Sequence, residues 1–542
     1  MATEILRQST LPDPFRTGLA NGWKVIDASA LTEDRTVEAD VAIVGTGAGG
    51  GTTAEILANA GLAVVMIEEG PLVTSSSFHM RESEAYPQLY QESAARKTKD
   101  KAINILQGRC VGGGTTVNWT SSFRTPAATL AYWASEYGLS GFDAADLAPW
   151  FERAEQRVNV ISWPVDPNEN NDALRRGAQA LGLNVGAIRR NVKGCWNIGY
   201  CGMGCPTNAK QSMLVTTIPA ALARGATLVT RARAWAFEHA RGRVTALDCI
   251  GLDAGGTDPT PRRFRVRAKT FVSSCGAIGS PALLRRSEVA DPHGILGKRT
   301  FLHPSLVSIA RMPERIDGFS GAPQTIYSDH FLEFAAPDGP IGYKLEAAPL
   351  HPVLGATTLP GFGAAHARWM HELPYAHVAI ALMRDGFHRE SPGGRVELRS
   401  DGTPVLDYPL NDYLWDGARR ALATMAEIQF AAGAKEVMPV RPAAVSYANW
   451  PEAREAMTGL PLGPATANVV SAHVMGGCPL GPDPRHAVVD PAGRYRELEN
   501  LYVFDGSLFP TSIGANPQLS IYAITAKLAS GLAEKLAPRP RS

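Results

Sequence analysis

The chain has 542 residues, of which 45% are hydrophobic and 19% charged, and its formal net charge is +1. This length exceeds one ordinary hydrophobic core and predicts about two to four domains of a globular protein. The balanced charge, with no basic or acidic block, excludes binding to nucleic acid or to a membrane surface by electrostatic attraction.

Transport signals and disulfides are not indicated either. No apolar run reaches the roughly 18 residues of a transmembrane helix, so we expect no transmembrane segment. The first residues, MATEILRQSTLPDPF, lack the apolar core of a signal peptide, and we expect a cytoplasmic protein. The seven cysteines are scattered and odd in number, unlike a secreted disulfide framework.

Residues 40–70 have the pattern of a dinucleotide-binding unit. An apolar run leads into three glycines at G-x-G-x-x-G spacing, a helical stretch follows, and a second apolar run ends in an acid. The glycines are Gly45, Gly47 and Gly50, and the acid is Glu68. Glycine turns also occur without a ligand, but here the strand, helix and acid all lie in register. The unit predicts an adenine dinucleotide, either FAD or NAD.

Each of these residues has its own expected task. Gly45 allows the tight turn, Gly47 lets the backbone approach a pyrophosphate, and Gly50 lets the helix pack closely on the strand. The helix N-terminus offers free N–H groups to the phosphates. The Glu68 carboxylate accepts hydrogen bonds from the ribose hydroxyls, which disfavours a 2′-phosphate.

A second glycine-rich stretch, GRCVGGGTTVN, occupies residues 108–118. Three consecutive glycines beside two threonines and an asparagine form a polar loop with an exposed backbone. Such a loop suits either contact with a polar cofactor edge or a plain turn. On the cofactor interpretation, the contacts are Gly108, Gly112, Gly113, Thr115 and Asn118.

The two stretches resemble the first two signatures of the glucose–methanol–choline (GMC) flavin oxidoreductases. CGAIGSPALLRRS at 275–287 resembles a third signature, and NLYVFDGSLFPTSIGANPQLSIYAITAKLA at 500–529 resembles the closing flavin-binding segment. These matches follow the family order from about residue 38 to residue 535. The resemblance implies FAD rather than NAD. It also implies flavin contacts in the last segment, at Asp505, Gly506, Pro517 and Gln518.

The fold class that the resemblance implies is α/β, or α+β overall. It combines a Rossmann-like FAD-binding domain with a discontinuous substrate domain built on an antiparallel sheet. After an N-terminal surface arm over 1–37, we expect FAD-binding segments at 38–125, 215–310 and 465–542, and substrate-domain segments at 126–214 and 311–464. The last FAD-binding segment also carries the active site.

Periodicity predicts several elements within these segments. They are a helix over 144–159, a strand over 226–239 followed by hairpin-like strands, strands over 377–385 and 395–400, and a helix over 412–433. The short strands from 226 onward resemble the family's adenine-side sheet, with Ala234 as the backbone contact to adenine. Some family members attach the flavin through a histidine just before the loop asparagine. Here that position is Val117, so we expect non-covalent FAD.

Alcohol oxidation by a flavin needs a group that takes the hydroxyl proton, and histidine suits this because its usual pKa lies near working pH. His473, in SAHVMGGCPLG, and Asn516, before a proline in GANPQLS, match the family's active-site pair. The resemblance implies that His473 is the general base and that Asn516 positions the substrate oxygen and donates to the alkoxide. His303 lies in LHPS, where the family has an acid before the histidine, and is expected to be structural.

Cys195, Cys201 and Cys205 lie close together in GCWNIGYCGMGCPTNAKQS. One branch of the family holds an iron–sulfur cluster near this place, but its pattern has adjacent cysteines, and here Trp196 follows the first one. The segment resembles more closely a loop of long-chain alcohol oxidases and related bacterial dehydrogenases. We expect packed thiols and no metal.

The resemblance implies oxidation of a CH–OH group to a carbonyl, with hydride transfer to flavin N5. Apolar residues over 345–382 favour a hydrophobic primary alcohol, aliphatic or aromatic, with sugar or steroid alcohols as the alternative. The alternatives of another class are a hydroxynitrile-lyase-like enzyme that keeps FAD without redox chemistry and a non-catalytic flavin-binding subunit. The electron acceptor stays open between oxygen, a quinone and a cytochrome.

Overall fold

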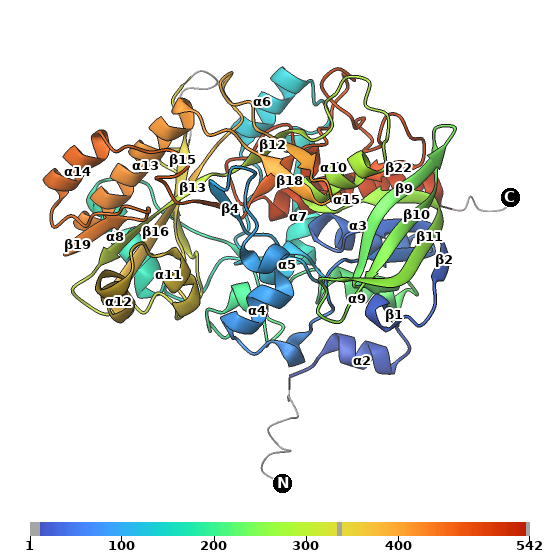
Figure 1. Ribbon diagram of the computed structural model, residues 1–542, viewed down its shortest axis with the longest axis horizontal. Helices are drawn as coiled ribbons and strands as arrows, with labels where there is room; N and C mark the ends of the chain where they lie inside the picture. The colour runs from blue at the N-terminus through green and yellow to red at the C-terminus, as the bar shows by residue number, and fades with distance from the viewer. Residues whose placement is uncertain (1–10, 333–338, 538–542) are drawn as a thin grey trace, which may run out of the picture.

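The structure is a computed structural model that describes residues 11–332 and 339–537. Parts of three expected segments, residues 1–10, 333–338 and 538–542, lie outside the described residues. Figure 1 shows the sheet that contains β2 and β11 towards one end of the molecule and the sheet that contains β13 and β16 towards the other. The expected α/β class is confirmed.

The first large sheet has eight strands and joins distant parts of the chain. Its order is β1 (Lys24–Asp27), β8 (Thr227–Thr230), β3 (Val64–Ile67), β2 (Arg35–Val44), β11 (Pro259–Ser273), β10 (Arg243–Leu252) and β9 (Ala232–Ala240), with β22 (Leu501–Val503) beside β11. β2 pairs in parallel with β3 and β11, whereas β9, β10 and β11 pair antiparallel. Residues 41–44 and 64–67 are fully buried, which explains their continuous apolar runs.

Four helices pack on one another beside this sheet: α3 (Ala48–Asn59), α7 (Ala144–Arg157), α9 (Thr217–Ala223) and α15 (Gln518–Leu536). α3 follows β2 directly, so its N-terminus lies at the carboxyl end of a central parallel strand, the edge where such sheets bind ligands. β1 falls within the segment expected to be a surface arm. It instead extends the sheet by pairing in parallel with β8.

The second large sheet is mostly antiparallel. Its order is β4 (Ile103–Ile105), β20 (Val469–Ser471), β13 (Ser305–Arg311), β16 (Ala376–Met383), β15 (Tyr343–Ala347), β14 (Ile326–Ser328) and β6 (Gly186–Ala187), with β19 (Glu436–Pro439) beside β13. On one face it packs against α8 (Glu169–Ala180) and α13 (Asp412–Ala431), with α14 (Trp450–Thr458) on α13. The opposite face packs with residues of α12 (Gly363–His371) and of the segment after α11 (Pro352–Thr358). β4, β13 and β20 belong to segments expected in the FAD-binding part, so this sheet takes in more of the chain than the expected boundaries.

A third, four-stranded sheet has the order β18 (Pro404–Asp407), β17 (Gly394–Leu398), β12 (Lys298–Leu302) and β21 (Val474–Gly476). β12 and β21 pair antiparallel, with Leu302 opposite Val474. The residue directly after β12 is His303, and the residue directly before β21 is His473. This register therefore brings two histidines from distant parts of the chain together.

The predicted helices and strands are found: α7 and α13 occupy the two predicted helical stretches, and β16 and β17 two of the predicted strands. The expected strand over 226–239 is divided into β8 and β9. Other elements near the site are α4 (Glu82–Leu89), α5 (Gly114–Val117) and α10 (Gly276–Arg286). Within the described ranges, none of the helices combines the length and apolar character that a membrane crossing requires.

Candidate active site

A cavity of about 780 Å³ is lined by residues of both large sheets. Its volume lies in the range of cofactor and substrate sites. Both predicted catalytic residues, His473 and Asn516, line it, and so do most predicted cofactor contacts: Gly45, Gly47, Glu68, Gly108, Gly113, Thr115, Asn118, Ala234, Asp505, Gly506, Pro517 and Gln518. Two predicted contacts, Gly50 and Gly112, do not line it.

The glycines of the first turn differ in what surrounds them. A Cβ on Gly50 would lie 1.9 Å from the carbonyl oxygen of Gly45, so Gly50 serves the packing of α3 on the turn. The atom nearest to a Cβ on Gly47 would be Cα of Gly113, at 3.9 Å. A Cβ on Gly113 would in turn lie 2.9 Å from Cα of Gly47. Gly47 and Gly113, from two separate loops, therefore form a cradle that added side chains would fill.

Gly112 does not line the cavity but stabilises the glycine-rich loop over 108–118. Its φ is +89°, and a Cβ there would lie 2.3 Å from Oγ1 of Thr116. A side chain at this position would therefore be strained in backbone and in packing. The N–H of Gly112 donates to Oγ1 of Thr46 at 3.0 Å, which joins the glycine loop to the first turn.

Glu68 ends β3 at the cavity and is buried. Its Oε2 accepts hydrogen bonds from the N–H and the hydroxyl of Thr46, at 3.1 and 2.6 Å, and its Oε1 accepts one from the N–H of Gly70 at 3.0 Å. Burial raises the pKa of Glu68, against the effect of these hydrogen bonds. A carboxylate can accept about four hydrogen bonds, so three internal donors leave capacity for about one from a ribose hydroxyl.

Glu69 also lines the cavity, although the sequence patterns did not single it out. Its carboxylate lies 3.1 Å from Nε of Arg109 and 3.1 Å from Nε of Arg233. Burial acts to raise the pKa of Glu69, but the two guanidinium charges hold it below its usual value. This cluster joins the glycine loop to β9, the strand that carries Ala234.

A buried lysine fixes the glycine loop. Lys210 donates to the carbonyl oxygens of Thr116, Asn118 and Cys201, at 2.7, 2.7 and 2.6 Å. Burial lowers the pKa of Lys210 to about 8. Because Thr116 lies in α5, the ammonium group ties the loop that lines the cavity to the cysteine segment.

The C-terminal contacts are held by hydrogen bonds across the fold. Asn118 donates from Nδ2 to Oε1 of Gln518 at 2.7 Å, which joins the glycine loop to the first residue of α15. The carboxylate of Asp505 accepts from the N–H groups of Gly276 and Ser507 at 2.9 and 2.8 Å. The side chain of Asp505, a residue that lines the cavity, is thus held by internal donors.

These features fit FAD. The cradle of Gly47 and Gly113 has space for a group that approaches the backbone, and it lies at the N-terminus of α3, where phosphate charge is favoured. Glu68 keeps one acceptor position, and Ala234 lines the cavity beyond it. α15 begins at the cavity with Gln518, and its positive dipole end supports negative charge there.

His473 is in contact with His303 at the other end of the cavity wall. Their Nδ1 atoms are 3.0 Å apart, and the rings are nearly perpendicular. The N–H of Gly514 donates to Nε2 of His303 at 3.2 Å, so that nitrogen carries no proton. A neutral His303 then donates its Nδ1 proton to His473, and a neutral His473 carries its own proton on Nε2. His303, expected to be structural, is thus a partner of the predicted catalytic histidine.

Both rings are neutral at neutral pH. Burial, followed by the charge of Lys344, lowers the pKa of His473 to about 3. Burial and the charge of His473 lower the pKa of His303 well below its usual value. The arrangement therefore supplies hydrogen-bonding nitrogens without placing a fixed positive charge on the rings.

Asn516 has two charged neighbours on β15. Its Oδ1 accepts a hydrogen bond from Nζ of Lys344 at 2.8 Å. Its Nδ2 donates to Oε2 of Glu346 at 3.5 Å. Neither Lys344 nor Glu346 lines the cavity, so both lie behind Asn516. The pattern analysis missed them because a lysine and a glutamate two positions apart ordinarily indicate a solvated face.

The cavity is apolar where it meets the second sheet. β16 places alternate side chains in the cavity wall, while Ala379 and Ala381 between them join the core with α13. The apolar wall residues are Val307, Leu350, Leu354, Val378, Ile380 and Leu382. This surface suits a hydrocarbon group rather than a hydroxyl-rich one.

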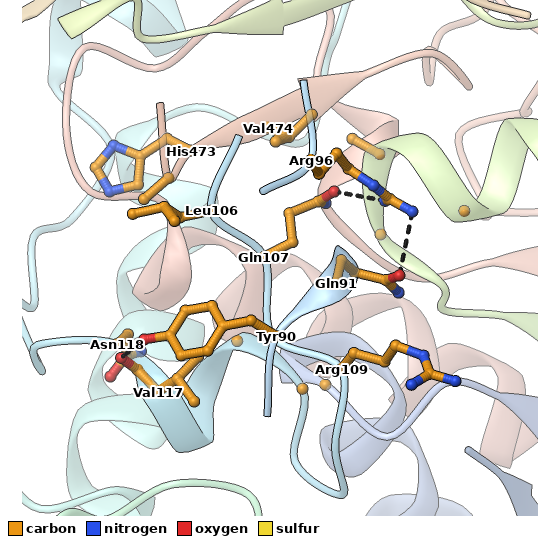
Figure 2. Close-up of a pocket in the computed structure, with 18 of the residues that line it drawn as sticks. Tyr90, Gln91, Arg96, Leu106, Gln107, Arg109, Val117, Asn118, His473 and Val474 are labelled. Atoms are coloured by element: carbon orange, nitrogen blue, oxygen red, sulfur yellow. Dashed lines mark hydrogen bonds between the residues drawn. The ribbon is translucent and has the colours of Figure 1, made fainter. Parts of the chain in front are cut away.

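A further wall of the cavity comes from residues that sequence reasoning passed over, because segment 71–105 has no clear periodicity. Figure 2 shows Gln91 and Gln107 on either side of Arg96, with Leu106 and His473 in the same view. Arg96 donates to Oε1 of Gln107 at 2.9 Å and to Oε1 of Gln91 at 3.1 Å. The guanidinium thus holds the two amides of this wall in place.

The thiols of the cysteine segment are half-buried. Cys195, Cys201 and Cys205 are all free. No group of three or more histidine, cysteine or acidic side chains within residues 11–332 and 339–537 is arranged to hold a metal ion. Sγ of Cys205 accepts a hydrogen bond from the N–H of Lys210 at 3.5 Å, so this thiol supports the lysine that holds the glycine loop.

Residues 86–305 match the N-terminal GMC oxidoreductase family model, and residues 390–525 match the C-terminal one. An uncharacterised GMC-type oxidoreductase of Sinorhizobium fredii is 31% identical over 92% of this chain and 95% of its own length. A long-chain-alcohol oxidase of Arabidopsis thaliana is 28% identical over 92% of this chain and 68% of its own.

Among solved structures, pyridoxine 4-oxidase from Mesorbium loti has the same fold. It superposes with a TM-score of 0.64 at 19% identity, over 91% of this chain and 98% of its own. The family models, the relatives and the fold agree with the cofactor cradle and the cavity described above. The chain therefore belongs to the GMC oxidoreductase family, and it is an FAD-dependent oxidoreductase that acts on alcohol-type donors.

Proposed function

We propose that this enzyme oxidises a hydrophobic primary alcohol, aliphatic or aromatic, to its aldehyde. The main support is that His473 and Asn516, from different segments, both line the cavity that also contains the Gly47–Gly113 cradle. FAD, when bound in that cradle, supplies the hydride acceptor. The apolar wall of β13 and β16 supports a hydrocarbon substituent, as does the similarity to a long-chain-alcohol oxidase.

In this proposal the substrate oxygen binds between two side chains. Asn516 donates to it from Nδ2 and stabilises the negative charge that develops as the hydroxyl proton leaves. His473 accepts that proton at Nε2. With the observed bond from Gly514, Nε2 of a neutral His473 already carries a proton. For His473 to accept at Nε2, its own proton must first move to Nδ1, and the Nδ1 proton of His303 must move to Nε2, which breaks the hydrogen bond from Gly514. This exchange makes His303 part of the mechanism.

We also propose that FAD is held without a covalent bond. Val117 lines the cavity just before Asn118, and its side chain has no nucleophilic atom for attachment. Denaturation with acid should therefore release the flavin into the supernatant. Flavin that stays with the precipitated protein would contradict this proposal.

The test of the reaction is anaerobic titration of the holoenzyme with alcohols while the flavin absorbance is recorded. Medium-chain, long-chain and benzylic alcohols are expected to bleach the flavin, and glucose is not. Recovery in air at a rate close to turnover would identify oxygen as the acceptor, and slow recovery would point to a quinone or cytochrome. Bleaching by glucose alone would refute the substrate class, and a flavin that no alcohol bleaches would refute the redox reaction.

A further inference from the structure

A buried ion pair lies directly behind one member of the proposed catalytic pair. Lys344 and Glu346 are separated by one residue on β15, so both side chains project from the same face of the strand. Their side chains are 3% and 0% exposed, and Nζ lies 2.8 Å from Oε1 of Glu346. Burial of two charges carries a desolvation cost, so such a pair is weak support for stability by itself.

The lysine is surrounded by groups that accept its positive charge. Nζ lies 3.2 Å from the ring centroid of Phe123 and 5.3 Å from that of Tyr327. Its hydrogen bond to Oδ1 of Asn516, at 2.8 Å, completes this environment. The ammonium group is itself buried, so besides the carboxylate of Glu346 it serves a buried partner, the amide of Asn516.

Each charged group bonds to a different end of the Asn516 amide. An ammonium group only donates hydrogen bonds, and a carboxylate only accepts them. Lys344 can therefore bond only to Oδ1, and Glu346 can bond only to Nδ2. The structure has this arrangement, with Nζ of Lys344 2.8 Å from Oδ1 and Oε2 of Glu346 3.5 Å from Nδ2. Rotation of the amide by a half turn would place its Nδ2 donor against the ammonium donor of Lys344. It would also place its Oδ1 acceptor against the carboxylate acceptor of Glu346.

From this we infer that Lys344 and Glu346 are positioning residues that hold Asn516 with its Nδ2 group towards the substrate. The inference rests on the proposed function. Since Oδ1 is held by Lys344 and Glu346 takes one Nδ2 hydrogen, the second Nδ2 hydrogen remains for the oxygen in the cavity. Asn516 then acts only as a donor, as an alkoxide requires. Without the pair, the amide can rotate and present Oδ1, which repels the developing charge.

The test uses the holoenzyme and the rate of flavin reduction by a saturating alcohol. Lys344→Met alone leaves a buried, unpaired carboxylate, so the main variant is Lys344→Met/Glu346→Gln, which removes both charges and keeps the volume. We expect reduction about 10- to 100-fold slower, with FAD content and the KM for the alcohol within about threefold of wild type. The matched control is Tyr343→Phe, at a residue whose side chain projects from the opposite face of the same strand. This change removes a hydroxyl that lies 2.7 Å from Oγ1 of Thr424.

The decisive step is to repeat the substitution in an Asn516→Ala background. If the pair acts through Asn516, the added change has no further effect there, because the amide that it orients is gone. An equal loss in both backgrounds, or a normal rate in the main variant, would overturn the inference while leaving the proposed function intact. A wild-type flavin that no alcohol reduces would refute the proposed function, and this inference with it.

Discussion

The two ends of the cavity are built in different ways. The cofactor end is made largely of backbone from short continuous stretches of sequence. Gly47 and Gly113 leave space there because they have no side chain. The reaction end is made of side chains from distant segments. One example is the contact between His303 and His473, which are 170 residues apart in the sequence. Adding atoms should therefore damage the first end, whereas removing hydrogen-bonding atoms should damage the second.

The reaction end should give the largest effect. His473→Ala removes the proposed proton acceptor, and we expect flavin reduction by alcohol to slow by about 10²- to 10⁴-fold. FAD binding should stay normal, because the cradle lies elsewhere in the cavity. Stopped-flow reduction and the ratio of flavin to protein absorbance measure the two properties. The control is His486→Ala, a change of an exposed histidine. Loss of FAD together with normal chemistry in the retained fraction would show that His473 is structural.

The partner of His473 provides a finer comparison. His303→Leu leaves Nδ1 of His473 without a partner, whereas His303→Asn keeps a group that can donate or accept at that position. We expect the leucine variant to reduce its flavin about 100-fold more slowly than wild type, and the asparagine variant to lose less than about tenfold, because orientation and tautomer of a catalytic histidine depend on its partner. Equal rates in the two variants would mean that His303 only fills space.

The cofactor end should respond to one added methyl group. Gly47→Ala is compatible with the protein itself, since the nearest atom to the new Cβ is 3.9 Å away, but the methyl group would occupy the cradle. Overpacking of about 1–3 kcal/mol corresponds to FAD binding weaker by about 5- to 150-fold. Gly531→Ala is the control, because a Cβ there meets no other atom within 4 Å. Titration of apoprotein with FAD gives both constants, and unchanged affinity in Gly47→Ala would place the pyrophosphate elsewhere.

The smallest effect concerns pH. His473 has its pKa lowered to about 3, so its ring stays neutral as the pH falls through the usual histidine range. The rate of flavin reduction should therefore change by less than about twofold between pH 8 and pH 5. A loss of rate centred near pH 6.5 would contradict the lowered pKa of His473. Stability behaves differently, because the unfolded chain binds protons below pH 6.5 that the folded His473 does not. The free energy of unfolding should thus decrease as the pH falls from 6.5 towards 3.

Sequence reasoning reached the cofactor end because its information is local. A strand, glycines at fixed spacing, a helix and Glu68 follow one another within 40–70, and each has a physical reason to stand at its position. The family resemblance added His473 and Asn516, and both line the cavity. The predicted strands and helices were also found, since their periodicity is a property of short stretches.

The tertiary structure alone decided which residues support those groups. The pairing of Leu302 with Val474 places His303 against His473, and no local pattern encodes a register between strands so far apart. Lys344 and Glu346 look like a solvated face of a strand until the fold buries them behind Asn516. Residue spacing thus determines that a dinucleotide binds, and the family resemblance determines which cofactor it is and the class of reaction. Packing across the sheets determines how protons and amide groups are oriented for that reaction.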